Sequence, residues 1–355
     1  MKNIINKIFD AKHRSRTFSY ILVIVCYILV EVLMSTGNIT SLLKGLLVPL
    51  CCYIVAALAL NLVVGVSGEL SLGQAGFMSI GAFSAVCVAG YLGNIVANDI
   101  VRLIIAMIVG AIVAAVFGFI IGIPVLKLQG DYLAIVTLAF GQIIKSVINN
   151  MYVGFDNNGF QFSFVTNNLK LGEGAKILLN GPMGATGTSR ISTFTVGVIL
   201  IIISLIVIYN LMYSKNGRAI MACRDNRIAA STVGINIANT KMLAFVISAA
   251  LAGAAGALYA LNYATLVPAK FDFNTSILIL VYVVLGGLGN MNGTIISTVV
   301  LLLLPELLRS LRDYRMLIYA IVLIVIMIVT NNSRMKTIIE SFKKKISGKG
   351  VKAHD

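Results

Sequence analysis

The stretch GLLVPLCCYIVAALALNLVVGVSG, residues 45–68, contains no charged side chain. A helix needs about 20 apolar residues to cross the hydrocarbon core of a bilayer, and this stretch is longer than that. It therefore predicts a membrane-spanning helix, and it sets the pattern against which the rest of the chain can be compared.

The composition of the whole chain agrees with this stretch. Of the 355 residues, 59% are hydrophobic and only 12% are charged, and the mean hydropathy is +0.96. A water-soluble domain cannot bury that much apolar surface and still present a charged exterior. The composition therefore predicts an integral membrane protein.

Similar windows lie on both sides of residues 45–68. Residues 18–34 predict the first span, which is retained rather than cleaved as a signal peptide. Residues 273–305 are too long for one helix and are interrupted by GGLGNMNG at 286–293, which predicts two segments with a break. We expect an all-α, polytopic transmembrane helical bundle of about 8–10 spans, the lower number applying if one or two segments are re-entrant. The remaining predicted spans are 70–98, 103–126, 132–150, 191–214, 242–269 and 316–330.

The charge distribution predicts the orientation. Lys and Arg outnumber Asp and Glu by 28 to 13, and the cations gather in residues 1–17, 214–240 and 331–355. Cytoplasmic segments carry such excesses, so both termini and the central loop are predicted to be cytoplasmic. The chain then divides into a basic arm (1–17), a transmembrane domain (18–330) and a basic tail (331–355), with residues 150–190 outside. Arg309, Arg312 and Arg315 would also lie outside, against the rule.

The sequence lacks the residues that several classes of function require. The chain has no G-x-x-x-x-G-K-[ST] motif, so it has no P-loop to bind ATP. The predicted spans contain no His, and no C-x-x-C pair occurs, so we expect no catalytic centre, metal site or cofactor. Because the cations are split among the termini and one loop, they predict a membrane lipid partner and no nucleic acid. The five cysteines are interpreted as small apolar residues: Cys26, Cys51, Cys52, Cys87 and Cys223.

One segment, residues 67–83, combines small side chains with an amide. Small residues allow neighbouring backbones to approach closely, so packing alone accounts for most of them. Gln74 also permits another interpretation, because an amide inside a membrane needs a hydrogen-bonding partner or water. A water-lined translocation path would supply one, and both interpretations stay open. The candidate path residues are Ser71, Gly73, Gln74, Gly76 and Ser79.

A second segment, residues 217–236, is a predicted cytoplasmic loop with the composition of a helix. Residues 218–233 contain no Gly or Pro, and Gly217 and Gly234 bracket them. The loop predicts a short amphipathic helix that docks in a groove of a partner, the alternative being a basic loop held against anionic lipid. The candidate coupling residues are Gly217, Arg218, Arg224, Asp225, Ile228, Ala229, Ala230 and Gly234.

These residues carry a resemblance. Ile228-Ala229-Ala230, with Gly234 four residues later, resembles the "EAA…G" loop of ATP-binding-cassette importer permeases, with Ile at the usual Glu position. LSLGQ at 70–74 favours the M-type subunit of the branched-chain amino acid permeases over its H-type partner. Residues 160–176 depart from a minimal member of that family. The likeness extends over about residues 48–327 and rests on four segments in order: 67–83, 129–150, the loop, and 286–309.

The resemblance implies a function and a set of partners. An extracytoplasmic binding protein would deliver a hydrophobic, branched-chain amino acid to a pore between this permease and a second, H-type permease subunit. Two separate ATPase subunits would drive transport through the 214–240 loop. The chain itself would be a transport subunit in the cell membrane and not an enzyme.

Two alternatives remain. A related family imports sugars and nucleosides with a similar permease fold. An ion-coupled secondary transporter would need carboxylates near the middle of the bilayer. The candidates for that role lie near the ends of apolar windows, where anchoring is the simpler role: Glu31, Glu69, Asp131 and Glu306.

Overall fold

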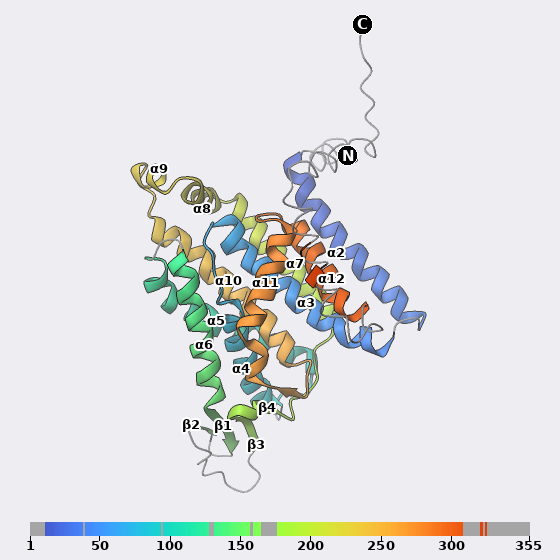
Figure 1. The fold of residues 1–355 in the computed structure, drawn as a ribbon. Helices are drawn as coiled ribbons and strands as arrows, with labels where there is room; N and C mark the ends of the chain where they lie inside the picture. The colour runs from blue at the N-terminus through green and yellow to red at the C-terminus, as the bar shows by residue number, and fades with distance from the viewer. Residues whose placement is uncertain are drawn as a thin grey trace. The chain divides into compact units, whose positions relative to one another are not determined.

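The computed structural model describes residues 11–37, 40–93, 95–127, 131–156, 159–164, 176–307, 320–321 and 324. Within these residues the chain forms a bundle of apolar helices (Figure 1), which confirms the predicted polytopic helical fold. Seven of the described helices are long and apolar enough to cross a membrane, and α11 (Phe273–Gly286) and α12 (Met291–Leu307) are shorter. Residues 1–10, the predicted tail (331–355), Arg309, Arg312, Arg315 and nearly all of the predicted last span (316–330) lie outside the described residues.

Three helices form the buried centre. They are α3 (Ser41–Asn61), which continues as the π-helix η1 (Leu62–Val66), α4 (Gln74–Leu92) and α10 (Ile237–Ala260). In their most apolar windows 83%, 67% and 72% of the residues are buried, whereas α2 (Ala11–Ser35) has only 11% buried. Helices α3, α4 and α10 therefore occupy the interior of the bundle.

Small residues bring α4, α10 and α5 (Asp99–Val125) close together. A Cβ atom added to Gly81 of α4 would lie 2.1 Å from the carbonyl oxygen of Gly253 on α10. Likewise, a Cβ added to Gly253 would lie 2.4 Å from the Cβ of Ala114 on α5. Only small side chains permit such backbone approach, so packing is a sufficient reason for this part of the small-residue pattern.

The outer helices expose apolar side chains. On α5 these recur every fourth residue and so form one stripe along the helix. Such a face suits lipid or another membrane-embedded subunit better than water. The other helices at the periphery are α6 (Asp131–Asn149) and α7 (Phe194–Tyr213). The stripe consists of Ile104, Ile108, Ile112, Val116 and Ile120, all exposed.

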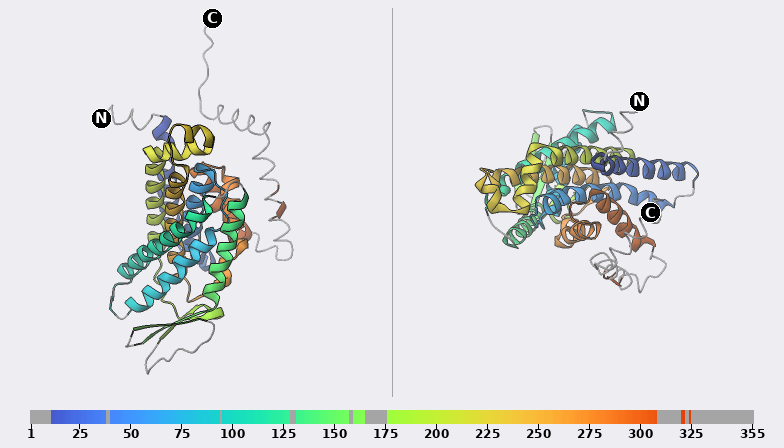
Figure 2. Two further views of the ribbon diagram at one scale, coloured as in Figure 1. Left: turned by 90° about the vertical axis from the view of Figure 1, so that its left-hand side faces the viewer. Right: turned by 90° about the horizontal axis from the view of Figure 1, so that it is seen from above.

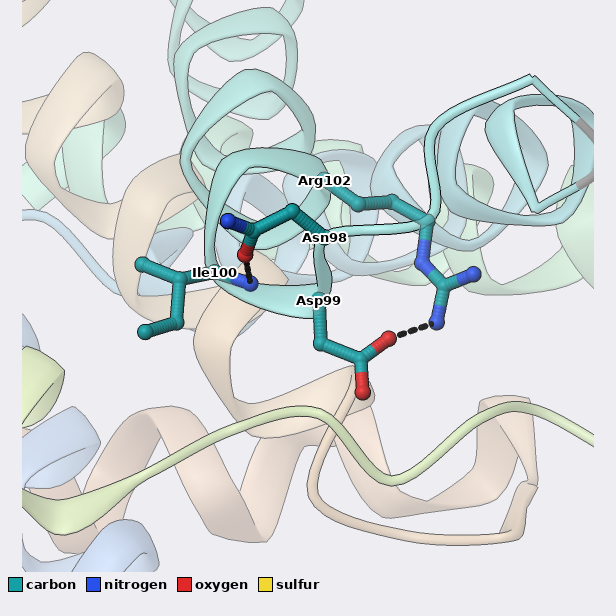
Figure 3. A network of polar contacts seen from close by, with 4 residues as sticks. All are labelled: Asn98, Asp99, Ile100 and Arg102. Carbon is teal, nitrogen blue, oxygen red and sulfur yellow. Dashed lines mark hydrogen bonds and ion pairs between the residues drawn. The ribbon is translucent and has the colours of Figure 1, made fainter.

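Helix boundaries differ from the charge-free windows where polar groups cap or pair. Helix α5 begins at Asp99, not at residue 103, because the Asn98 side chain accepts a hydrogen bond from the Ile100 N–H at 3.1 Å. Arg102 is then accommodated in the first turn by its ion pair with Asp99 at 2.6 Å (Figure 3). Helix α2 also begins earlier than predicted, at Ala11 rather than at residue 18.

A small antiparallel sheet follows α6. It consists of β1 (Met151–Asp156), β2 (Gly159–Phe164) and β3 (Lys176–Asn180) in the order β2-β1-β3. A second pair joins β4 (Ala185–Thr186) to β5 (Thr265–Leu266). These strands were not predicted. They lie at the opposite end of the helices from α8 (Lys215–Asp225) and α9 (Arg227–Thr232), as Figures 1 and 2 show.

Candidate functional site

Residues 67–73 form a non-helical connecting segment between η1 and α4. Gly68 adopts φ +73°, which turns the chain back after η1. The segment enters the bundle, because the next residue, Gln74, donates a hydrogen bond from Nε2 to the carbonyl of Ala56 at 3.2 Å. Along α3 and η1 the rise from Ala56 to Val66 is about 15 Å, so α4 begins well inside the bundle.

Helices around the connecting segment bond to its end and to the first turn of α4. The Leu72 N–H donates to Oγ1 of Thr137 on α6 at 3.0 Å, and the Ala75 N–H donates to Oγ of Ser276 on α11 at 3.1 Å. Irregular backbone is tolerated at membrane depth only where it is buried in protein or lines a cavity. In the connecting segment Ser67, Glu69, Ser71 and Gly73 are buried in protein, whereas Gly68 and Leu70 are exposed.

The predicted path residues therefore do not share one helix. Ser71 and Gly73 lie in the connecting segment, and α4 contains only Gln74, Gly76 and Ser79. All five are buried within this chain. Gln74 finds its partner on α3, whereas Oγ of the fully buried Ser79 has no hydrogen-bond partner among the described residues.

A small hollow lies beside this segment, where α4, α6 and α11 meet. Gly76 is the one predicted path residue that lines it, and its backbone passes close to Gly141 of α6. The hollow is far too small to hold a ligand, since ordinary ligand pockets measure about 300–1,000 Å³. Its lining combines apolar and polar groups and consists of Leu72, Ala75, Gly76, Leu138, Gly141, Gln142, Phe271, Asp272, Phe273 and Ser276.

Glu69 of the connecting segment makes a buried ion pair with Lys241 of α10. Glu69 is 6% exposed and Lys241 is 3% exposed. Buried charges require such a partner, because an isolated one is very costly to remove from water. Glu69 therefore links the connecting segment to α10.

Helices α8 and α9 correct the predicted single helix over residues 218–233. Asn226 interrupts it, with φ −152° and ψ 106°, and its side chain caps α9 by accepting from the Ala229 N–H at 3.0 Å. Gly217 was predicted to bracket the helix, but it lies inside α8. A Cβ added to Gly217 would lie 2.0 Å from the Leu211 carbonyl oxygen. Gly234 does turn the chain after α9, at φ +85°.

Arg224 of α8 faces the chain's own backbone. Its Nη1 donates to the Gly65 carbonyl at 2.9 Å, and its Nη2 pairs with Asp225 at 2.9 Å. Its methylene groups lie over Gly68, where an added Cβ would be 2.5 Å from Cγ of Arg224. Arg218 donates to the Tyr213 carbonyl at 3.3 Å.

The candidate coupling residues of α9 divide into two faces. Ala230 is 5% exposed and packs within the chain. Ile228 is 78% exposed and Ala229 is exposed beside it, while Val233, just after the helix, is 80% exposed. Two large apolar side chains so fully exposed on one short helix are typical of a surface that a partner covers.

Comparison with known proteins agrees with this architecture. Residues 42–329 match the family model described as branched-chain amino acid transport system / permease component. The chain belongs to this permease family. The match includes the connecting segment, α8, α9 and the turn between α11 and α12.

Individual members of the permease family are similar to this chain. The high-affinity branched-chain amino acid transport system permease protein LivM of Salmonella typhimurium is 35% identical over 219 residues, covering 59% of this chain and 52% of that protein. LivM of Escherichia coli gives the same identity and coverage. LivH of Salmonella typhimurium is 31% identical over 149 residues, covering 39% of this chain and 48% of that protein.

The similarity is partial in length. The chain spans about half the length of the curated relatives it matches. The fructose import permease FruG of Bifidobacterium longum is also similar, at 25% identity over 177 residues, covering 48% of each protein. A comparison with solved structures gives no significant match.

The sequence did not predict several residues that build this permease site. Lys241 directly precedes the charge-free window at residues 242–269, and nothing in the sequence indicates that it pairs with the distant Glu69. Asn61 is fully buried and bonds both Thr294 and the Gly289 N–H, each at 2.8 Å, and so joins α3 to the turn at 286–293. An Asn within an apolar window was the available signal, because a buried amide needs such partners.

Proposed function

We propose that this chain is the membrane-spanning permease subunit of an ATP-binding-cassette importer for a branched-chain, hydrophobic amino acid. The observation that carries the proposal is the family match over residues 42–329, together with 35% identity to LivM. Since the chain has no P-loop, ATP hydrolysis belongs to separate ATPase subunits. The relatives named LivM and LivH support a second, H-type permease subunit and an extracytoplasmic binding protein as further partners.

The proposed orientation places α8 and α9 on the cytoplasmic side, with both termini. The cations of residues 1–17, 214–240 and 331–355 support it through the positive-inside rule. The strands β1–β3 then lie on the outside, where the binding protein would approach. The arm (1–17), the transmembrane domain (18–330) and the tail (331–355) keep the roles predicted for them.

The proposed coupling surface consists of Ile228, Ala229 and Val233 on and just after α9. Their exposure supports docking into an ATPase groove, because desolvating large apolar side chains favours association. Ala230 supports the fold of α9 instead. Gly217, Arg218, Asp225 and Gly234 position the two helices beneath that surface, while Arg224 joins α8 to the Gly65 carbonyl of η1.

The proposed translocation path runs beside the connecting segment and the first turns of α4. Ser71, Gly73, Gln74, Gly76 and Ser79 are buried in the isolated chain, so the path opens only when the subunit changes conformation or pairs with its partner. The nearby hollow combines apolar side chains with Gln142, Asp272 and Ser276, and its apolar part suits a substrate with an apolar side chain.

The test is transport by the purified complex. The tagged chain is isolated from its native membranes with whatever subunits it retains, and is then reconstituted into liposomes with the binding protein. We expect a P-loop ATPase to co-purify and uptake of labelled leucine to require ATP. Excess isoleucine and valine should compete, and fructose should not.

Two outcomes would contradict the proposal. ATP-dependent uptake of fructose without leucine uptake would support the sugar alternative that FruG represents. Leucine uptake driven by a proton or sodium gradient, with no ATPase bound, would make the chain a secondary transporter.

A further inference from the structure

We propose that Arg224 and the Glu69–Lys241 ion pair are positioning residues that link α8 and α9 mechanically to the start of α4. The inference rests on the proposed function, because it concerns how movement at the ATPase surface reaches the translocation path. It differs from ATPase docking itself, since none of these three side chains belongs to the exposed apolar surface of α9.

The first part of the link joins α8 to η1. Arg224 donates to the Gly65 carbonyl at 2.9 Å, while its methylene groups lie over Gly68. On its other side Gly65 is held by the turn between α11 and α12, where an added Cβ would lie 2.2 Å from the Gly289 nitrogen. The guanidinium group of Arg224 thus holds a backbone that has no room to slide past it.

The second part joins α10 to the connecting segment. Lys241 lies in the first turns of α10, and Glu69 directly follows the Gly68 turn. The chain segment containing α8 and α9 is therefore bonded to residues 65–69 from both directions, through Arg224 ahead of α9 and through Lys241 after it. If α8 and α9 are displaced, residues 65–69 must move with them or one of these contacts must break.

The third part carries the displacement to α4. The start of the connecting segment is tied to η1, because the Ser67 N–H donates to the Leu62 carbonyl and the Glu69 N–H donates to the Val63 carbonyl, each at 3.1 Å. At its far end Leu72 bonds Thr137 of α6, and Gln74 bonds Ala56 of α3. Leu72 also lines the hollow. A pull on residues 65–69 therefore acts where α4, α6 and α11 meet.

The chemistry of the ion pair fits this role better than a purely stabilising one. An apolar pair of similar size would fill the same buried position at little or no cost in stability. What two opposite charges add is a directional contact that resists separation. The ion pair therefore suits a contact that must hold while α8 and α9 are displaced.

The deciding experiment uses the reconstituted complex and measures leucine uptake per ATP hydrolysed. For Arg224→Ala we expect normal insertion, normal ATPase retention and continued ATP hydrolysis. We expect the uptake-to-hydrolysis ratio to fall about tenfold, since a hydrogen bond to a charged group is worth about that factor. Arg224→Lys, which keeps a cationic donor, should recover part of the ratio. Lys215→Ala is the matched control, because it removes an exposed cation from the same helix.

A second series tests the ion pair. The double variant Glu69→Leu/Lys241→Met avoids an unpaired buried charge, and we expect it to insert, to bind the ATPase and to show a similarly lowered ratio. The charge-swapped pair Glu69→Lys/Lys241→Glu should recover it. If the apolar pair does not insert, the Arg224 series decides by itself.

An unchanged ratio in both Arg224→Ala and the apolar pair would overturn the inference while leaving the proposed function intact. By contrast, if the unaltered chain retains no ATPase, the proposed function itself fails, whatever the variants do.

Discussion

At the scale of single residues, three buried polar side chains of the described site each have a named partner in another element. Gln74 bonds the Ala56 carbonyl, Asn61 bonds Thr294, and Glu69 pairs with Lys241. Such groups are costly to bury without partners, so their contacts fix which helices lie together.

Gln74→Leu tests the path at this scale. The leucine side chain fills a similar volume but cannot donate to the Ala56 carbonyl, a loss of about 1 kcal/mol. We expect the variant to insert and assemble normally while leucine uptake falls. The control is Ser204→Ala on α7, which removes a buried hydroxyl that bonds only its own helix at Leu200. Normal uptake by Gln74→Leu would assign the amide to packing alone.

Gly234→Val tests the turn after α9. An added Cβ meets nothing within 4 Å at this position, so the effect is purely one of backbone, at φ +85°. A β-branched residue there costs about 1–3 kcal/mol, which should redirect α9 and lower ATPase retention on the purified complex. Gly187→Val imposes the same kind of strain, at φ +71° and without a clash, and should retain the ATPase. Equal retention by both variants would contradict a role for this turn in docking.

At the scale of elements, the loop between α7 and α10 is two helices with different tasks. Helix α8 faces the bundle through the fully buried side chains of Ile220 and Cys223, whereas α9 exposes Ile228. The division occurs at Asn226, whose side chain is the N-cap of α9. One helix is anchored to the permease and the other is presented outward.

Substitution on α9 separates docking from folding. We expect Ile228→Asp and Val233→Asp to insert normally and to lose the ATPase, because a carboxylate in an apolar groove must be desolvated. Ala230→Trp should act differently: it overpacks the chain's own interior, at about 1–3 kcal/mol, and should lower the amount of folded permease. ATPase retention divided by permease yield distinguishes the two. Full retention by both aspartate variants would rule out this face as the docking surface.

At the scale of the whole molecule, the orientation in the membrane is the property on which the proposed roles depend. We expect a cysteine at Arg218 to be protected from impermeant thiol reagents in sealed cells and to react once the membrane is opened. A cysteine at Met183, which is 61% exposed beside the strands, should react from outside. The native cysteines are first replaced, since Cys26 is exposed. External labelling at Arg218 would reverse the proposed topology.

The sequence predicted the helices better than it predicted their connections. Residues 45–68 and the break at 286–293 were predictable, because charge-free length and clustered glycines have direct structural consequences. Lys241 and Asp99 were not, because each charge is accommodated by a partner that only the folded chain brings close.

The candidate site was predicted in part. Gly234 was correctly expected to turn the chain, because its conformation is a local property. The orientation of Arg224 toward Gly65, and the burial of Ala230, depend on contacts between distant segments. The strands after α6 were missed for the same reason, since β3 pairs with β1 across a long separation in sequence.

The division of the loop at Asn226 has a consequence for evolution. Because α9 has its own cap and faces outward, its sequence can diverge to match a new ATPase without disturbing α8. A chimera that exchanges only residues 227–233 with those of another member of the family should therefore acquire that member's ATPase while keeping its own substrate. Recognition of the ATPase by α9 and transmission of its movement through α8 would then be inherited as separate modules within one short loop.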